Sequence, residues 1–446
     1  LTWSAPTEQS LIVTINGVKQ QEDAYSVSGT TLTLTSALVS TDKLEVIGIN
    51  DIGTTITPAQ GSVTNDMVSS SAAIAQSKLA TLAIDTAELA ADAVTPAKMA
   101  DSAFLANRNI VRNGAMQIAQ RGTTETGITA SGYSTCDRFR FSLETLGTWT
   151  STQESLTSGD AYADGFQKAF RVDCTTADAS PSAADYFVFQ QKIEGYDVQA
   201  LKKGTANAES VTLSFWVKSS TTGTYIFGLF DRDNTRSIWQ SYTISSADTW
   251  EKKTLTFSGD TTGAFGCDNG ASLELWWYLG AGTDYTSGTL QTSWGANVWA
   301  NTAVGQVNLA SSTSNDWAIT GVQFEIGDTA TPFEHKTYGQ ELAACQRYYR
   351  EIAGYTGVGR NSPATIRVSC PISPEMRATP SVALGSTNNF QDGDGTVIAG
   401  DGLSNLSSTS SAYAGTFTVS GTAPQSHRPY IHAASSGGTS KLDAEL

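Results

Sequence analysis

The stretch VTLSFWVK, residues 211–218, alternates apolar and polar side chains and predicts a β-strand with one buried face. The same alternation recurs in TYIFGL (residues 224–229) and in WEKKTLTF (residues 250–257). Successive strand residues point to opposite faces of a sheet, so each stretch would bury every second side chain. The three stretches therefore predict half-buried antiparallel strands.

The composition also favours β-structure. Only 16% of the 446 residues are charged, and the sequence is rich in Thr, Ser and Gly, with 40 glycines. Short β-branched and aromatic runs between such residues are typical of β-sandwiches and not of helix bundles. With about 150 residues per domain as a guide, this length predicts roughly three modules with separate cores.

The charge balance argues against a nucleic-acid partner. Asp and Glu total 43 and Lys and Arg total 27, a formal net charge of −16, and no basic cluster interrupts the acidic background. The sequence has no apolar run of about 18 residues and no signal peptide, so we expect neither membrane insertion nor signal-directed secretion. The first residue is Leu1 and not methionine, which leaves open an upstream anchoring domain.

The first module is predicted as a small antiparallel β-domain over residues 1–50. A strand at residues 11–15 ends at Asn16-Gly17, a strong hairpin-turn signal. The further expected strands cover residues 25–27, 31–34 and 44–47.

Residues 51–108 carry an internal repeat in a background of Ala, Ser, Thr and Asp. Each of four units has a β-branched residue and, five positions later, a second apolar anchor. The pairs are Val63 and Val68, Ile74 and Leu79, Ile84 and Leu89, and Val94 and Met99, and three of the units are spaced by ten residues. Ordering a residue costs about 1–2 kcal/mol, whereas burying one aliphatic side chain returns about 1.5–3 kcal/mol. We therefore expect several parallel chains to join these residues at a common axis, forming an oligomeric stalk.

The repeat spacing does not fit a heptad coiled coil. Heptads alternate steps of three and four residues, whereas the steps here are five and five, and Pro96 lies inside a unit. Short helical turns separated by kinks fit this pattern better. A disordered Ala-rich linker is the alternative interpretation.

Cysteine and histidine usage gives little sign of a metal site. The five cysteines are widely spaced without a C-x-x-C pair, and we expect them to be reduced and mostly buried. His427 and His432 are four residues apart, which is a weak metal-binding signal. We predict no cofactor, although hard oxygen ligands for a structural calcium ion would be available from Asp173, Asp231, Asp233 and Asp268.

Near the C-terminus, residues 338–350 predict a short amphipathic helix with Leu342, Cys345 and Tyr349 on one face. Strand-like runs at residues 364–368 and 413–419 predict a further small β-sandwich within residues 351–446. The loops at residues 386–411 are long and polar.

Several motifs resemble those of bacteriophage tail fibres. The segment DAVTPAKMAD (residues 92–101) is similar to the repeats of fibre stalks. NIVRNGAMQIAQRG (residues 109–122), followed by Tyr133 and Asp137-Arg138-Phe139, resembles the opening of a fibre module with a jelly-roll fold. The most specific similarity runs from PFEH (residues 332–335) to ELAACQRYY (residues 341–349), and PEMRATP (residues 374–380) also resembles fibre tips.

The segments SFWVKSS (residues 214–220) and DTWEKKTLTFSGD (residues 248–260) are similar to carbohydrate-binding modules of jelly-roll form. These resemblances imply a homotrimer in the virion, assembled in the host cytoplasm and joined to the phage tail or to adaptor proteins. They also imply attachment to a host-surface polysaccharide or another receptor. The implied domains are a stalk at residues 51–108, a carbohydrate-binding-like jelly roll at residues 109–337, a helical junction at residues 338–350 and a β-rich tip at residues 351–446.

Sugar recognition needs aromatic faces that stack on pyranose rings and polar groups that fix hydroxyls. The candidate residues are Trp239, Trp276, Trp277, Tyr278, Tyr285, Trp294 and Trp299. Trp216, Trp250 and Trp317 lie inside regular strand patterns and are expected in the core or between sheets. The consecutive Trp276 and Trp277 must face opposite ways, and which one faces outward is left open.

Two other functions are left open. A tailspike that cleaves polysaccharide would need paired carboxylates about 5–10 Å apart. The sequence contains no motif that distinguishes such a pair, no G-x-S-x-G, and no H-E-x-x-H, so we expect no enzymatic activity. A purely structural head or tail fibre is the other alternative.

Overall fold

The computed structural model describes residues 1–48 and 107–446, apart from residues 6, 353–355, 362–363, 384–387, 395–396, 421–423 and 433–439. The chain divides into two compact units, Leu1–Ala90 and Ala91–Leu446, which are treated separately below. The repeat units and the stalk contacts predicted from Val63 to Met99 lie outside the described residues. No helix in the described ranges has the length and apolar character needed to cross a bilayer.

The N-terminal unit forms the predicted β-strands. β1 (Leu11–Ile15) pairs antiparallel with β2 (Val18–Lys19) and β5 (Leu44–Gly48), and β3 (Tyr25–Ser28) pairs with β4 (Thr31–Leu34). Asn16 and Gly17 have φ of 52° and 78°, so the two-residue turn adopts the left-handed conformation that a tight hairpin requires. Two short 3-10 helices, η1 (Glu8–Ser10) and η2 (Glu22–Ala24), precede β1 and β3. Leu11, Val13 and Tyr25 form the centre of a small core.

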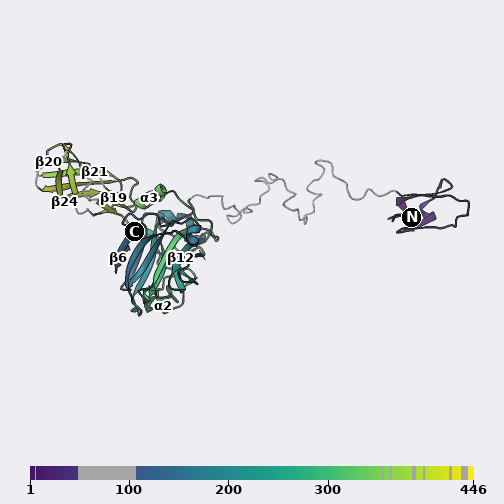
Figure 1. Cartoon of the computed structure of the whole chain (residues 1–446), viewed down its shortest axis with the longest axis horizontal. Helices are drawn as coiled ribbons and strands as arrows, with labels where there is room; N and C mark the ends of the chain where they lie inside the picture. Colours follow the sequence, from purple (N-terminus) through teal and green to yellow (C-terminus); the bar gives the residue numbers. More distant parts are fainter. Residues whose placement is uncertain are drawn as a thin grey trace. The chain divides into compact units, whose positions relative to one another are not determined.

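The second unit begins with a jelly-roll β-sandwich of two antiparallel sheets (Figure 1). The six-stranded sheet has the order β15 (Glu251–Phe257), β12 (Val211–Ser219), β18 (Asp316–Ile326), β10 (Lys168–Thr176), β9 (Thr148–Ser155) and β6 (Thr124–Ile128). The seven-stranded sheet has the order β17 (Gly295–Ala296), β14 (Arg236–Ile244), β13 (Gly223–Asp231), β16 (Ala271–Ala281), β11 (Tyr186–Glu194), β8 (Phe139–Glu144) and β7 (Gly132–Tyr133). The alternating stretches that predicted strands thus lie in β12, β13 and β15. The half-buried prediction is wrong for β13, because Phe227 and Leu229 are buried in the core while Ile226 and Phe230 are buried on the opposite face.

The sandwich core lies between the two sheets and follows the sequence alternation. On β12, Leu213, Phe215 and Val217 are buried in the core. Trp216 and Trp250 belong to a separate cluster on the outside of the six-stranded sheet, so their expected place in the core or between the sheets is wrong. Trp317 is fully buried in the core, as expected for a residue inside a strand pattern.

The outward face of the seven-stranded sheet, called the outer face below, is partly covered by residues 282–308. This segment carries α2 (Thr283–Thr286), β17 and η7 (Trp299–Asn301), and η8 (Leu309–Ser311) follows it. It is fixed by the backbone amide of Trp239, which donates to Gln291 O at 2.8 Å, and by a 2.9 Å hydrogen bond between the Tyr278 and Thr302 hydroxyls. Two further short helices, α1 (Asp160–Ala163) and η6 (Gly195–Leu201), connect strands elsewhere.

After the sandwich, α3 (Tyr338–Gln346) begins at a capping box formed by Thr337 and Gln340. The helix ends before Tyr349, which lies in β19, so the predicted helical face that included Tyr349 is wrong. β19 (Tyr349–Ile352), β27 (Ser440–Asp443) and β22 (Ser381–Ala383) form a three-stranded sheet.

The remaining C-terminal strands form a closed barrel and not the predicted sandwich. Its order is β20 (Thr356–Asn361), β21 (Ala364–Pro371), β25 (Ala412–Ser420), β24 (Val397–Ser408), β23 (Asn388–Gln391) and β26 (Pro429–His432) (Figure 1). β26 pairs with both β20 and β23, which closes the ring, so the six described strands leave no open edge in this sheet.

Candidate functional site

An open hollow with a volume of about 490 Å³ lies on the outer face of the seven-stranded sheet. It is lined by Tyr186, Trp276, Asp284, Tyr285, Ser287, Trp299 and Ala300. Tyr186 comes from β11 and Trp276 from β16, while the other residues come from the covering segment that contains α2 and η7. The hollow therefore forms where this segment meets the sheet.

Strand alternation places Trp276 in the floor of the hollow. Trp277 points into the sandwich core and is fully buried, so Trp276 points to the outer face. The neighbouring position on β13 is Gly228, where a Cβ would lie 1.9 Å from the ring of Trp239. Because residue 228 is glycine, the Trp239 ring can pack directly against the backbone of β13 on the outer face. It lies beside Trp276, and the centroids of the two rings are 6.0 Å apart.

The exposed ring of the hollow belongs to Trp299, which is 44% exposed. It lies 5.7 Å from Phe230 in a stacked arrangement and 6.0 Å from Trp276, both measured between ring centroids. Tyr285 approaches the Trp299 ring edge-on at 6.2 Å. Because several rings support it, Trp299 offers an ordered apolar surface to a ligand.

Polar groups surround these rings. Asp284 contributes a carboxylate and Ser287 a hydroxyl at the rim. Burial raises the pKa of Tyr285 to about 12, and the neighbouring Tyr186 and Asp284 add to the shift. The protonated Tyr285 hydroxyl can donate a hydrogen bond to a ligand.

Three of the seven predicted sugar-binding residues line this hollow: Trp276, Tyr285 and Trp299. Tyr186 also lines it and was missed. The sequence does contain a signal for Tyr186, because it directly precedes Phe187 and Phe189, which alternate along the strand and are both buried in the core. An outward direction for Tyr186 follows from that alternation.

The other predicted contacts require correction. Trp239, Trp277 and Tyr278 are fully buried, so none of them offers a face to a ligand. Trp277 is a core residue, and Trp239 and Tyr278 are covered by residues 282–308. Both were candidate sugar contacts because nothing in the sequence pattern of the loop indicated that it folds over the sheet.

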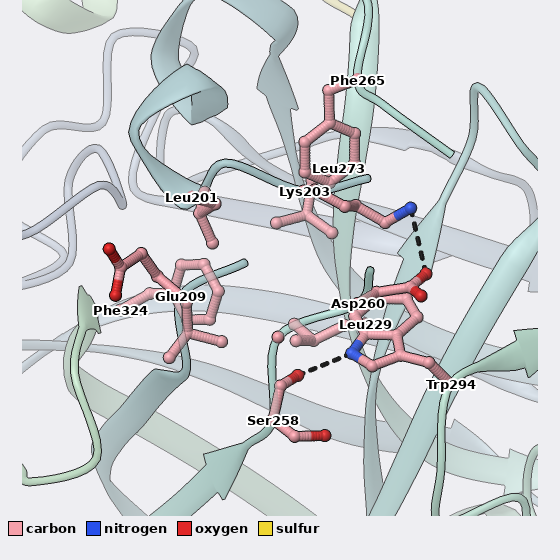
Figure 2. A pocket seen from close by; sticks show the side chains of 12 residues that line it. Leu201, Lys203, Glu209, Leu229, Ser258, Asp260, Phe265, Leu273, Trp294 and Phe324 are labelled. Atoms are coloured by element: carbon pink, nitrogen blue, oxygen red, sulfur yellow. Dashed lines mark hydrogen bonds and ion pairs between the residues drawn. The ribbon is translucent and has the colours of Figure 1, made fainter. Parts of the chain in front are cut away.

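Trp294 lines a different and much smaller cavity, of about 20 Å³ (Figure 2). Its indole N–H donates to Ser258 O at 2.8 Å. Beside it, the buried Lys203 ammonium lies 2.5 Å from Asp231 and 3.1 Å from Asp260. A space of this size holds about one water molecule, so this cavity is too small for a sugar ring, and the role of Trp294 as a sugar contact stays a prediction.

The acidic residues considered as calcium ligands form ion pairs or hydrogen bonds with other parts of the chain. Asp231 pairs with Lys203, and Asp173 accepts hydrogen bonds from Arg171 at 2.7–2.9 Å. Asp233 and Asp268 accept backbone amides of Gly266 and Gly270, both at 2.8 Å. Within the described ranges, no cluster of three or more His, Cys, Asp or Glu residues is arranged to hold a metal.

Cys136, Cys174 and Cys345 are buried, which confirms the expectation of mostly buried thiols. His335 packs against Phe166 and Phe333, with ring centroids 5.4 Å and 4.9 Å away.

Most of the fibre-like motifs meet at a second site, called the junction below, between the sandwich and the C-terminal strands. The buried Arg138 forms an ion pair with Glu445 and lies over the ring of Tyr348, with its guanidinium carbon 3.4 Å from the centroid. Arg121 lies 3.1 Å from Asp443 and stacks over Tyr349 at 3.6 Å.

Further hydrogen bonds hold the same chain segment. Arg377 donates to Ala444 O at 2.6 Å and to Glu445 O at 2.9 Å, and the Tyr133 hydroxyl donates to Leu446 O at 3.0 Å. Arg347 contacts Glu194 through two hydrogen bonds of 2.9 Å and 2.7 Å. Residues 443–446 are thus held against the sandwich by the motifs around residues 133–138, 345–349 and 374–380.

No family model and no curated protein sequence matches the chain. Similar solved structures include the enzymatically active domain of tailspike protein 4 of bacteriophage CBA120, which is 14% identical over 49% of this chain with a TM-score of 0.25. This chain covers only 21% of the tailspike structure.

Two bacterial structures match a similar share of the chain. A candidate sugar-binding protein from Bacteroides thetaiotaomicron is 13% identical over 49% of this chain and 100% of its own length, with a TM-score of 0.28. A family 11 carbohydrate-binding module from Clostridium thermocellum, solved with a β-1,3-1,4-mixed-linked tetrasaccharide, is 11% identical over 48% of this chain and 98% of its own length, with a TM-score of 0.23. At these low TM-scores the similarities decide no functional question.

Proposed function

We propose that the chain is a subunit of a bacteriophage tail fibre and that it binds a host-surface glycan in the hollow on the outer face. The observation that carries the binding proposal is an open hollow in which Tyr186, Trp276, Tyr285 and Trp299 surround a space bordered by Asp284 and Ser287. Pyranose rings present apolar C–H faces to aromatic rings and hydroxyls to carboxylates and hydroxyl groups. The fibre-like motifs in the sequence support the fibre assignment.

The size of the hollow fits this role. Small-molecule sites typically measure about 300–1,000 Å³, and the hollow has about 490 Å³. Because it is open to solvent, a long polysaccharide could pass through it without ending there. An exposed glycan chain on a cell surface would therefore be a suitable ligand.

We propose binding without cleavage. Glycoside hydrolysis commonly needs two carboxyl groups on opposite sides of the scissile bond. Among the described lining residues, Asp284 supplies the one carboxylate. A receptor-binding role needs no second one.

We further propose that the fibre is a homotrimer held together through the repeats of residues 51–108, located in the virion and joined to the tail or to adaptor proteins. The spacing of the repeat anchors supports an assembly of chains, and the fibre resemblance supports the number three. Sedimentation of the full chain should give a trimer. A monomer with the repeats intact would contradict this proposal.

Binding should be tested with the full chain on a glycan array and on host cells. Wild type should bind, and Trp299→Ala should lose most of the binding. The matched control is Tyr196→Ala, which removes a ring that is 57% exposed and lies outside the hollow. Equal binding by Trp299→Ala and wild type would contradict the proposed site, and release of new reducing ends would favour a glycan depolymerase.

A purely structural fibre is the second candidate, and the junction favours it. The buried contacts of Arg138 and Arg121 fix the C-terminal segment to the sandwich, as a stiff spacer would require. Absence of binding to every host glycan and to host cells would support this alternative.

A further inference from the structure

The outer face carries a row of basic side chains next to the hollow. Lys192 on β11 lies opposite Glu274 on β16, and Arg140 on β8 lies two residues further along, opposite Gln190. Arg232 follows the end of β13 and reaches the same Glu274 carboxylate. These three residues, Arg140, Lys192 and Arg232, are called the basic row.

The basic row is connected to the aromatic floor through Glu274. The Trp276 indole N–H donates to one Glu274 carboxylate oxygen at 2.8 Å. The other oxygen lies 3.1 Å from Arg232 and 3.7 Å from Lys192. One buried carboxylate therefore joins the floor of the hollow to two cations.

The exposed ring of the hollow also adjoins the basic row. The backbone amide of Asn297, two residues before Trp299, donates to Thr235 O at 2.9 Å, in the turn that carries Arg232. Trp299 stacks on Phe230, which lies directly opposite Glu274 in the sheet. A ligand on Trp299 would thus lie next to the Arg232 side chain, which is 55% exposed.

The basic row has too few carboxylates for its positive charge. Lys192 and Arg232 share Glu274, and no ion pair to Arg140 occurs within the described ranges. Arg171, which points outward from the other sheet, has three carboxylates within 4.0 Å, from Glu154, Asp173 and Asp316. In a chain with 43 acidic and 27 basic residues, such a local excess of positive charge stands out.

The electrostatics of Lys192 point the same way. Burial lowers the pKa of Lys192, and the positive charges of Arg140 and Arg232 lower it further, while Glu274 opposes the shift. An additional negative charge at this position would stabilise all three cations.

We infer that the hollow, if it binds glycans as proposed above, selects acidic glycans, and that the basic row holds their negatively charged substituents. The sugar ring stacks on Trp299, and its carboxylate, sulfate or phosphate group faces Arg232, while Lys192 on β11 and Arg140 on β8, further across the sheet, hold anionic groups of neighbouring sugars. Asp284, at the α2 side of the hollow, then contacts neutral hydroxyls. The two ends of the site therefore carry opposite charges, negative at Asp284 and positive at the basic row.

The test uses the full chain and pairs of polysaccharides that differ only in charge. The carboxylate pair is polygalacturonate and its methyl ester, and the sulfate pair is dextran sulfate and dextran. The acidic member of at least one pair should bind more tightly than its neutral counterpart, and the pair that responds identifies the anionic group. Added salt should weaken this binding.

Substitutions separate site-specific recognition from general attraction. Arg232→Gln should weaken binding of the acidic member about tenfold, the loss expected for one charged hydrogen bond. Arg232→Lys should retain much of it, and Arg171→Gln on the other sheet should bind like wild type. Equal affinity for acidic and neutral members, or an Arg232→Gln protein that binds like wild type, would overturn the inference.

The outcomes also distinguish this inference from the proposed function. If Trp299→Ala abolishes binding but both members of each pair bind equally, the glycan site stands and the charge selectivity fails. If no glycan binds, or if Trp299→Ala binds like wild type, the proposed function fails and this inference with it.

Discussion

The hollow and the junction are built from the same kinds of side chains and differ in what completes them. At the junction, Arg138 is 1% exposed, lies over Tyr348 and pairs with Glu445. In the hollow, Trp299 and the neighbouring Arg232 are 44% and 55% exposed. At the junction the arginine and its carboxylate are both enclosed by the fold, whereas in the hollow Trp299 and Arg232 stay accessible and Arg232 shares Glu274 with Lys192.

Breaking the junction should have the largest effect on stability. Arg138→Met leaves the buried Glu445 carboxylate with Arg121, 3.3 Å away, but without Arg138, and loss of one member of a buried ion pair typically costs about 3–5 kcal/mol. Urea unfolding of the second unit should shift accordingly. Lys252→Met, which removes a 44% exposed ion pair with Asp164, should change stability by less than about 1 kcal/mol.

A double variant sharpens this prediction. Arg138→Met combined with Glu445→Leu removes both charges, so it should be more stable than Arg138→Met alone. If the double variant is instead the less stable of the two, the contribution of Arg138 is packing against Tyr348 and not charge pairing.

Removing the exposed ring should affect binding and leave stability nearly unchanged. Trp299→Ala should cost about 2 kcal/mol or more in glycan binding, roughly a 30-fold loss of affinity, because a central aromatic contact is removed. Titration calorimetry with a bound glycan and a thermal melt of the same sample would measure both effects. A large fall in melting temperature would show that Trp299 mainly covers the sheet.

A substitution beneath the hollow should lower both stability and glycan binding. Gly228→Ala places a Cβ 1.9 Å from the ring of Trp239, and overpacking of this kind costs about 1–3 kcal/mol. The displaced ring should also disturb Trp276 and weaken binding. Gly122→Ala is a partial control. The added Cβ meets nothing within 4 Å, so it causes no overpacking, but the φ of 124° at this position strains an alanine backbone.

The smallest predicted effect is the pH dependence of the stability that Glu194 at the junction contributes. Burial raises the pKa of Glu194, but hydrogen bonds from Arg347 and Tyr348 outweigh it and bring this pKa below the ordinary value of 4.5. A lowered carboxyl pKa stabilises the fold above pH 4.5, and this contribution is lost as the pH falls through the lowered pKa. We expect about 1 kcal/mol, because Arg347 is partly exposed.

Urea midpoints measured across this pH range would show the effect as a difference between wild type and Glu194→Gln. The difference should shrink as the pH falls. A difference that stays constant would mean that the Glu194 charge does not contribute.

The sequence predicted the parts of the sandwich that follow strand alternation. Leu213, Phe215 and Val217 point into the core, and Trp276 and Trp277 point to opposite faces, because the period of a strand is fixed by its backbone. The burial of Trp239 could not be predicted, since it depends on a covering segment without a regular pattern.

The junction shows a different limit. The residues of its motifs were identified, but their role depends on contacts between Arg138 and Glu445, which are 307 residues apart. Nothing in either local sequence indicates its partner. The barrel closure at β26 likewise depends on pairing between strands that are distant in sequence.

The separation between Arg138 and Glu445 also has a consequence for the order of folding during synthesis. Chains emerge from the ribosome at about 5–20 residues per second, so roughly 15–60 s pass between the appearance of these two residues. In the last part of that interval, after β18 has emerged, the strands of the sandwich are complete while Arg138 still lacks Glu445. We therefore expect the sandwich to mature late, with residues 443–446 acting as the last piece that closes it.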